Sequence, residues 1–379
     1  MGSGLLCRFV CGGAGGGGNF YHYAVFQVIV APMINFAVIG INHGHIYGQI
    51  ACLLGAGAKF VAWYAPEPDL AAEFAPKFPK VKRVADKRAI LEDPNIQLVL
   101  SASIPADRAP LGIEVMRHGK DYMSDKPGMT TLAQLDEVRR VQAETQRIYS
   151  ICYSEHFETR STVKAGELVH AGAIGRLVQT VGLGPHRTNL PTARKPNAAG
   201  RADWFFMKER YGGVLCDIAS HQFEQFLFFT GVTQAEIVSS QVGNFKYPQY
   251  PELEDFGDCT VRGTNGHHGP ATGYIRVDWY TPDGLPTWGD GRLTLLGTEG
   301  YIELRKYVDI GGQAGIDHLL LVKHDGIQRI DCSAVPLPYG AQLIQDVLNR
   351  TETAMPQWRC FLAMELALKA QSHATRIAG

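Results

Sequence analysis

The segment YGGVLCDIASHQFEQFLFFTG, residues 211–231, places a carboxylate and an imidazole one helical turn apart within a phenylalanine-rich stretch. Asp217 and His221 are four residues apart, so they share one face of a helix. Phe223 and Phe226 fall on the opposite side and would anchor the helix in a core. An imidazole suits proton transfer near neutral pH, and a carboxylate can orient it. The pair therefore predicts a general base on a buried helix that borders a cleft.

Two other interpretations of this pair stay open at the level of sequence. Asp217 could cap the helix while His221 is a hydrogen-bonded core histidine. Alternatively, Cys216 could join the pair as a metal ligand, although consecutive helical residues point in different directions. None of the eight cysteines forms a CxxC pair, so no metal site is predicted.

The tripeptide DKP, residues 125–127, is a second group of residues that could take part in catalysis. Lys126 follows a short apolar stretch, and Pro127 disfavours helix at the residue before it. An ammonium group at the end of a buried strand can stabilise the charge that develops when a hydroxyl group loses its proton. We therefore predict that one cleft brings together Lys126, Asp217 and His221, although the lysine is far from the other two in the sequence.

The letters INFAVIGINHGHIYGQI predict a buried strand, a glycine turn and a helix that begins near His45. Gly40, Asn42 and His45 occupy the three positions of the dinucleotide fingerprint G-x-G-x-x-G, of which only the first keeps its glycine. With His43 and Gly44, this turn would present backbone N–H groups and a helix N-terminus to a pyrophosphate. An ordinary turn without a ligand is the alternative.

The residues after the second strand bear on the choice of cofactor. Ala65 stands where an acidic residue usually holds the ribose hydroxyls, and Glu67 follows two residues later. Glu67 would repel a 2′-phosphate, and no Arg or Lys follows at once. NAD is therefore predicted, with NADP as the alternative. Ser101, Asp125 and Lys126 are also expected beside the cofactor.

Strands and helices alternate from residue 33 to residue 154, which predicts a Rossmann-type, doubly wound parallel sheet. Residues 155–379 predict an α+β domain with a large, mainly antiparallel sheet, because turn signals separate several β-rich runs. A sheet that is open on one face must be covered or solvated, so a homodimer or homotetramer through this sheet is expected.

Residues 1–32 contain GGAGGGG and are predicted to form a flexible extension, with Met33 as the functional start. An extra strand in YAVFQVIVA is the alternative.

The 36 basic and 37 acidic residues nearly balance, which argues against a nucleic-acid partner. No stretch approaches the length of a membrane span. Scattered cysteines favour reduced thiols and a cytoplasmic location.

Five residues near the predicted cleft are candidate substrate ligands. His156 follows the last strand of the parallel sheet, and His186 begins a long polar loop. Arg201, Asp203 and Trp204 end that loop, where a charged pair beside an aromatic ring suits a hydroxylated ring. The alternative for these three residues is a surface salt bridge beside a buried tryptophan.

Three features together resemble the glucose–fructose oxidoreductase, inositol dehydrogenase and rhizopine-catabolism (Gfo/Idh/MocA) family of NAD(P)-dependent oxidoreductases. They are the turn at Gly40, the tripeptide DKP, which is similar to the family's E-K-P, and GGVLCDIASHQFEQ, which is similar to G-G-G-x-x-x-D-x-G-x-H-x-x-D. The resemblance covers residues 33–379. Asp125, Ala219, Gln225 and Asn42 depart from the family pattern, and Asn42 puts the cofactor geometry in question.

The resemblance implies hydride transfer between a nicotinamide and a carbinol carbon of a sugar, polyol or inositol-like substrate. Lys126, Asp217 and His221 would be the catalytic group, with His221 as the base and Lys126 beside the developing alkoxide. A glycosidase or lyase that uses tightly bound NAD for transient oxidation is one alternative, and a cofactor-binding sensor without turnover is another. Retention of all three residues argues against the sensor.

Overall fold

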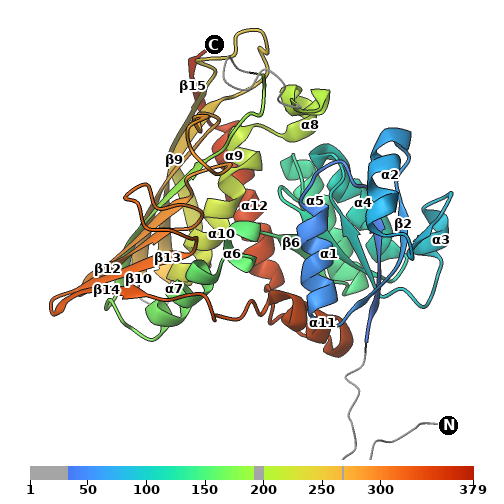
Figure 1. Cartoon of the computed structure of the whole chain (residues 1–379), viewed down its shortest axis with the longest axis horizontal. Coiled ribbons are helices and arrows are strands. Elements are labelled where there is room, and N and C mark those ends of the chain that lie inside the picture. Colours follow the sequence, from blue (N-terminus) through green and yellow to red (C-terminus); the bar gives the residue numbers. More distant parts are fainter. Residues whose placement is uncertain (1–32, 192–199, 267–268) are drawn as a thin grey trace, which may run out of the picture. The chain divides into compact units, whose positions relative to one another are not determined.

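The first half of the described chain forms a six-stranded sheet in which every pair of neighbouring strands is parallel (Figure 1). The computed structural model describes residues 33–191, 200–266 and 269–379. The strands are β1 (Asn35–Ile39), β2 (Lys59–Tyr64), β3 (Lys82–Arg83), β4 (Leu98–Ser101), β5 (Asp121–Asp125) and β6 (Tyr149–Cys152). Their order, β3-β2-β1-β4-β5-β6, is that of the Rossmann fold, so the predicted doubly wound sheet is confirmed.

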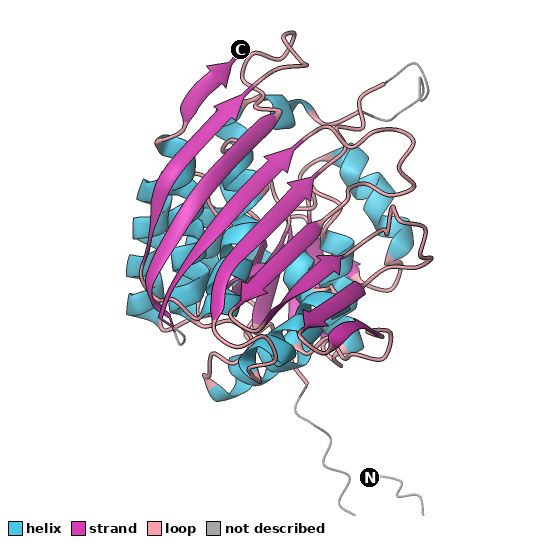
Figure 2. Ribbon diagram, turned by 90° about the vertical axis from the view of Figure 1, so that its left-hand side faces the viewer, coloured by secondary structure: helices cyan, strands magenta, loops and turns pink. Residues whose placement is uncertain are grey.

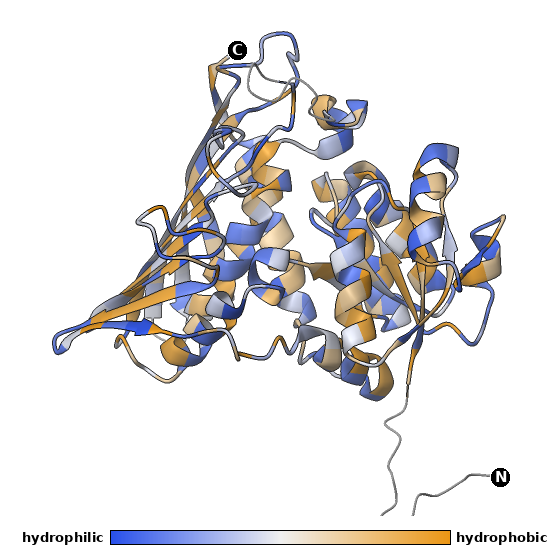
Figure 3. Cartoon of the chain, viewed as in Figure 1, coloured by the Kyte–Doolittle hydropathy of each residue, from blue (hydrophilic) through white to orange (hydrophobic). Residues whose placement is uncertain are grey.

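Helices connect these strands, and hydrophobic residues dominate the interior strands (Figure 3). The helices are α1 (Ile46–Gly55), α2 (Pro68–Phe74), α3 (Arg88–Leu91), α4 (Pro105–Arg117) and α5 (Leu132–Thr145), and a short 3₁₀ turn, η1 (Ala75–Lys77), follows α2. Thr131 caps α5 as its sequence predicts, because its hydroxyl accepts a hydrogen bond from the backbone N–H of Gln134 at 3.1 Å.

The second half is built on a nine-stranded sheet in the order β14-β13-β12-β11-β7-β10-β9-β8-β15. Its strands are β7 (Leu177–Pro185), β8 (Ala235–Gly243), β9 (Phe256–Gly266), β10 (Gly269–Asp278), β11 (Arg292–Gly297), β12 (Gly300–Arg305), β13 (His318–Lys323), β14 (Gly326–Ile330) and β15 (Thr375–Ala378). Only the pairs β7–β10 and β8–β15 are parallel, so the predicted mainly antiparallel sheet is confirmed.

Helices cover one face of this sheet and leave the other open (Figure 2). The helices of this half are α6 (Ser154–Phe157), α7 (Arg160–His170), α8 (Lys208–Tyr211), α9 (Val214–Asp217), α10 (Ala219–Thr230), α11 (Tyr339–Asn349) and α12 (Gln357–Ser372), with a 3₁₀ turn, η2 (Asp203–Phe206), before α8. Of these, α11 packs against α1 instead of the sheet. Large hydrophobic side chains are exposed on five strands of the sheet: Val238, Leu296, Tyr301, Ile327 and Ile377.

The segment 211–231 differs from its prediction as one continuous helix. It contains α9 and α10, which are separated at Ile218. Gly212 and Gly213 precede α9 with φ of +91° and +94°, a region that favours glycine. A Cβ at Gly213 would lie 2.2 Å from the side chain of Gln371, so the close approach here is to α12. Phe223 and Phe226 of α10 are buried as predicted.

The end of the chain also differs from its prediction. The letters CFLAMELALKAQSHATRI predict one helix, but α12 ends at Ser372 and β15 follows it. Thr375 and Arg376 pair in parallel with Gln241 and Val242 of β8. The strand forms because pairing satisfies backbone groups at the edge of the sheet, a tertiary contact that helical periodicity does not report.

The helix α12 ties the second half to the parallel sheet. The side chain of Gln357 accepts a hydrogen bond from the backbone N–H of Tyr149 at 2.9 Å and donates to its carbonyl at 3.2 Å. The thiol of Cys360 reaches the same carbonyl at 3.3 Å. Side chains of α12 therefore satisfy backbone groups at the outer edge of β6.

A protein that begins at Met33 should keep the melting temperature of the full chain and its affinity for cofactor. Residues 33–379 form one compact unit, and the core begins at the buried Ile34. Residues 1–32, with the predicted extension and its alternative strand, lie outside the described residues. Scanning calorimetry of both proteins checks this, and a loss of several degrees on truncation would assign a structural role to the removed segment.

Candidate active site

Lys126 and Asp217 form a buried ion pair, with 2.8 Å between Nζ and Oδ1. The lysine follows the last residue of β5, and the aspartate is the last residue of α9. Burial alone would raise the pKa of Asp217, but the ammonium of Lys126 lowers it below its usual value. The structure thus brings together these two residues, although 91 positions separate them.

His221 lies in the first turn of α10 and is almost completely buried, with its ring edge-to-face against Tyr153 at 5.8 Å. Burial lowers its pKa to about 3, and the nearby charge of Lys126 adds to the decrease. The sequence led us to expect a histidine that titrates near neutrality, and this expectation is wrong for the free protein because the ring is cut off from water.

His186 joins this group at the end of β7. Its Nδ1 lies 3.1 Å from the carbonyl oxygen of Gly184, and its ring packs against Trp279 and Trp288 at centroid distances of 5.5 and 4.6 Å. Burial lowers the pKa of His186 to about 4, and Lys126 contributes to the decrease. His186 is therefore a neutral imidazole beside the lysine.

His156 does not join the group, contrary to the prediction that it binds substrate. Its Nδ1 lies 2.9 Å from Glu224 Oε2, and its ring packs against Phe157 and Phe228 at 4.7 and 4.1 Å. These contacts occupy a buried ring inside the second half of the chain. We therefore assign His156 to an internal contact with Glu224.

Arg201 is held between two aromatic rings, with Phe205 at 4.4 Å and Trp279 at 4.3 Å. Its guanidinium donates to the backbone carbonyls of Arg187 and Thr188, at 2.7 and 2.8 Å. Burial lowers its pKa to about 10. These contacts make Arg201 part of a rigid wall rather than a surface ion pair.

The predicted charged pair of Arg201 with Asp203 is not formed within the described residues. Asp203 is exposed at the start of η2. Trp204 is buried and stacks on Phe205 with 3.8 Å between ring centroids. Phe205 in turn lies 5.9 Å from the ring of His43, so this aromatic wall reaches the turn after β1.

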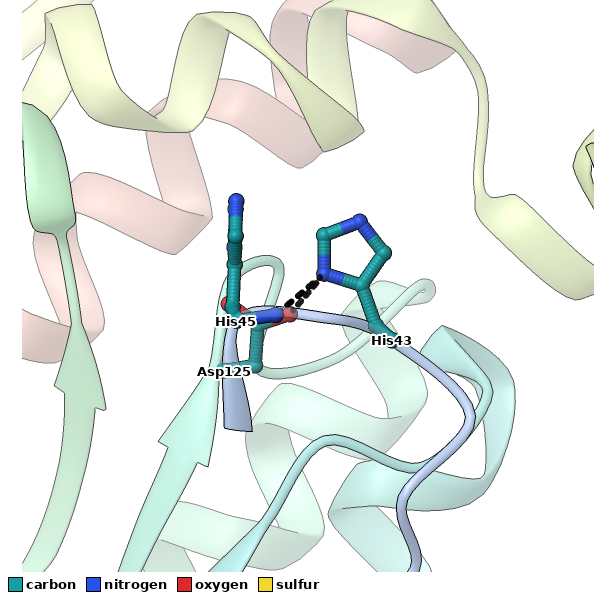
Figure 4. Close-up of side chains that lie close together, drawn as sticks. All are labelled: His43, His45 and Asp125. Atoms are coloured by element: carbon teal, nitrogen blue, oxygen red, sulfur yellow. Dashed lines mark hydrogen bonds and ion pairs between the residues drawn. The ribbon is translucent and has the colours of Figure 1, made fainter. Parts of the chain in front are cut away.

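Asp125 connects that turn to the end of β5 (Figure 4). Its carboxylate lies 3.1 Å from His43 Nδ1 and 2.9 Å from His45 Nδ1, and both rings turn toward it. Arg108 Nη2 donates to Oδ2 at 3.0 Å, and the backbone N–H of Lys126 donates to Oδ1 at 2.8 Å. Burial would raise the pKa of Asp125, but His45 and Arg108 hold it well below its usual value.

The ligand atoms of His43, His45 and Asp125 lie within 4.8 Å of one another, a spacing that a metal ion could use. The sequence predicted no metal site, and it missed this cluster because the turn and the DKP tripeptide are far apart in the chain. Arg108 and the backbone of Lys126 already occupy both carboxylate oxygens. A guanidinium on the same oxygen would repel a divalent cation, so the cluster is better suited to hydrogen bonding.

The turn after β1 has the backbone that a dinucleotide requires at its first position. Gly40 has φ of +84°, and a Cβ there would lie 1.8 Å from the hydroxyl oxygen of Ser103. Ser101, expected beside the cofactor, is fully buried and bonds to Ser103 at 2.8 Å. Ser103 is therefore the serine that lines the turn. Gly44 is exposed, and α1 begins at Ile46, close to the predicted residue.

Glu67 lies beside this turn, because Asn42 Nδ2 donates to its Oε1 at 2.7 Å. The other oxygen, Oε2, is buried without a hydrogen-bond partner among the described residues, as a ribose-binding carboxylate would be. Sequence reasoning missed Arg83, which reaches the carbonyl of Ala65 at 3.4 Å and stacks on Trp63 at 5.3 Å. Arg83 and Ala65 line one hollow at the end of β2.

The parallel sheet, the glycine turn and the buried lysine–aspartate pair define a nucleotide-binding oxidoreductase with a second, mainly antiparallel domain. Residues 34–153 match the oxidoreductase family with an NAD-binding Rossmann fold, and residues 162–303 match the GFO/IDH/MocA C-terminal domain. The chain belongs to the Gfo/Idh/MocA family of oxidoreductases, which confirms the resemblance seen in the sequence.

Similar proteins agree with this assignment. A solved structure from Erwinia carotovora atroseptica SCRI1043 is 45% identical, with a TM-score of 0.85, over 91% of this chain and 100% of that chain. Levoglucosan dehydrogenase from Pseudarthrobacter phenanthrenivorans is 28% identical over 61% of this chain and 60% of that protein, less than two thirds of its length. scyllo-Inositol 2-dehydrogenase (NAD(+)) from Bacillus subtilis is 24% identical over 71% of this chain and 73% of that protein.

Replacing Asp125 by Ala should lower the free energy of unfolding by about 3–5 kcal/mol, because Arg108 would remain buried without its carboxylate. Urea denaturation measures the change. The control, Glu137→Ala, breaks the exposed pair with Arg140 and should leave stability near that of the parent protein. Equal losses in the two variants would show that burial of Arg108 is not what makes Asp125 important.

Proposed function

We propose that the protein oxidises a carbinol carbon of a sugar, polyol or inositol-like substrate with NAD as the hydride acceptor. The observation that carries this proposal is the buried contact of Lys126 with Asp217, next to His221 and the dinucleotide turn. Membership of the oxidoreductase family supports the reaction class. Levoglucosan and scyllo-inositol dehydrogenases among the relatives support hydroxylated rings as the substrate class.

Each residue of the group has one task in this proposal. A bound nicotinamide would supply the hydride acceptor. His221 would take the proton of the substrate hydroxyl, since a neutral imidazole is a base. Lys126 would stabilise the alkoxide charge that develops on the same oxygen. Asp217 would hold the ammonium of Lys126 at the reacting atoms. His186 and the wall of Arg201 and Trp204 would contact the sugar ring.

We further propose a homodimer or homotetramer that covers the open face of the nine-stranded sheet, because Val238, Leu296, Tyr301 and Ile327 expose apolar side chains on its strands. Among the described residues, no helix is long and apolar enough to cross a membrane. The six cysteines in the described part of the chain are free thiols, which supports the proposed cytoplasmic location.

Lys126→Ala should lower turnover by several orders of magnitude while cofactor still binds, and His221→Ala should lower it on the order of 10²–10⁴-fold. Steady-state rates with NAD and a polyol panel measure both effects. Lys164→Ala is the control, since Lys164 forms an exposed pair with Glu167. Full activity in His221→Ala would mean that the histidine is there for stability alone. A cleaved or dehydrated product, formed without net NADH, would favour the transient-oxidation alternative.

NAD should bind more tightly than NADP, because the free oxygen of Glu67 can accept from a ribose hydroxyl but would repel a 2′-phosphate. Isothermal titration calorimetry with both cofactors measures the difference. Glu67→Ala should reduce the difference in affinity between NAD and NADP, because it weakens the binding of NAD. Arg83→Met, at the end of the neighbouring strand β3, is the control and should leave NAD binding unchanged. If NADP binds more tightly than NAD and this preference is lost in Arg83→Met, NADP would be assigned as the cofactor instead.

A further inference from the structure

Glu155 and Lys306 form a buried ion pair that the proposed reaction does not use. Lys306 follows β12 and is fully buried, and its Nζ lies 2.9 Å from Glu155 Oε2 and 2.7 Å from Gln225 Oε1. The amide of Gln222 donates to the same Glu155 oxygen at 2.8 Å. Glu155, in α6, is therefore fixed through Oε2 by donors from two other elements.

The other oxygen of Glu155 and one ring nitrogen of His221 are both left without a partner. Glu155 Oε1 and His221 Nδ1 are wholly buried, and neither has a hydrogen-bond partner among the described residues. Folded proteins rarely keep such atoms without a function, because each one costs desolvation free energy. A carboxylate oxygen and an imidazole nitrogen complement each other when the nitrogen carries the proton.

Glu155 is also the charge that most favours protonation of His221. Burial lowers the pKa of His221 most, and the Glu155 carboxylate opposes that decrease. The other titratable groups that act on the ring come from the end of β5, the dinucleotide turn and the end of β7, and all disfavour a proton there: Lys126, His45 and His186. Tyr153 packs against the ring from the end of β6. Asp217 is bound to Lys126 instead.

We propose that Glu155 is a positioning residue that keeps the imidazole proton of His221 on Nδ1, so that Nε2 is the base, and stabilises the imidazolium that forms during turnover. This inference rests on the function proposed above. It assigns to Glu155 the orienting task that the sequence assigned to Asp217.

The carbinol C–H bond breaks and its hydrogen leaves with the electron pair to the nicotinamide, while the O–H proton passes to His221 Nε2 and a C=O bond forms. The imidazolium, which then carries a proton on each ring nitrogen, is stabilised by the charge of the Glu155 carboxylate. Burial would raise the pKa of Glu155, but the Lys306 ammonium holds it below its usual range. Lys306 thus keeps Glu155 from taking the proton itself.

The test compares Glu155→Gln with a matched control, Glu224→Gln, in the full chain. Glu224 is as buried as Glu155, is paired with His156, and lies in the same helix as His221. Each variant removes one buried carboxylate charge, but only Glu155 acts on His221. The ¹⁵N chemical shifts of the ring nitrogens, assigned with His221→Asn, report the tautomer without any substrate.

We expect the Nδ1–H tautomer in the parent protein and in Glu224→Gln, and a shift toward Nε2–H in Glu155→Gln. A neighbouring carboxylate typically shifts a pKa by about one to two units. Loss of the Glu155 carboxylate beside His221 should therefore lower kcat on the order of 10- to 100-fold, with cofactor affinity unchanged. Glu155→Asp keeps the charge and should recover part of kcat. If Glu155→Gln does not fold, the double variant Glu155→Leu/Lys306→Met removes the pair without leaving an unpaired charge, and the same shift is expected.

An unchanged His221 tautomer in every Glu155 variant would overturn the proposal, and so would equal losses of kcat in Glu155→Gln and Glu224→Gln. A protein that oxidises no polyol would instead contradict the proposed function. The tautomer measurement needs no turnover, so the role of Glu155 would still be decided in that case.

Discussion

The ion pair of Lys126 with Asp217 is the contact on which the candidate site depends. One partner directly follows a strand of the parallel sheet, and the other ends a helix that packs on the nine-stranded sheet. Separating them would leave a charge buried without its counter-charge, which costs several kcal/mol in proteins. The pair can therefore exist only while the two halves of residues 33–379 are packed together, and it places the reacting groups at the junction of the two sheets.

Three buried ion pairs surround the histidines of the site: Arg108 with Asp125, Lys126 with Asp217, and Lys306 with Glu155. Each carboxylate is neutralised by its own cation, so little negative charge is left to stabilise a proton on the imidazoles. Burial then lowers the pKa of His43 and of His221 to about 3, and that of His186 to about 4. The result is a set of neutral imidazoles among fixed charges, which suits proton acceptance but requires help once a proton arrives.

The sequence predicted both sheets and the convergence of Lys126 with Asp217, although not their ion pair. Hydrophobic periodicity reports local structure, and the family motifs report a shared site. The sequence did not predict β15, which depends on an edge of β8, or the break of the helix at Ile218. Nor did it predict Glu155 and Lys306, which are 151 residues apart and carry no local motif. The prediction that His156 binds substrate failed although its position after β6 was right, because its ring contacts Glu224. Contacts between distant segments decided each of these cases.

Two departures from the family pattern, which looked independent in the sequence, explain each other in the structure. Asp125 is one methylene shorter than the glutamate of E-K-P, and His45 is bulkier than the glycine or alanine usual at the third fingerprint position. The His45 ring reaches the carboxylate at 2.9 Å, and His43 reaches its other oxygen at 3.1 Å. A longer side chain at position 125 would compete with these rings for the same space. The shorter acid and the histidine-rich turn therefore belong to one arrangement, in which the turn is fixed to the end of β5, one residue before Lys126.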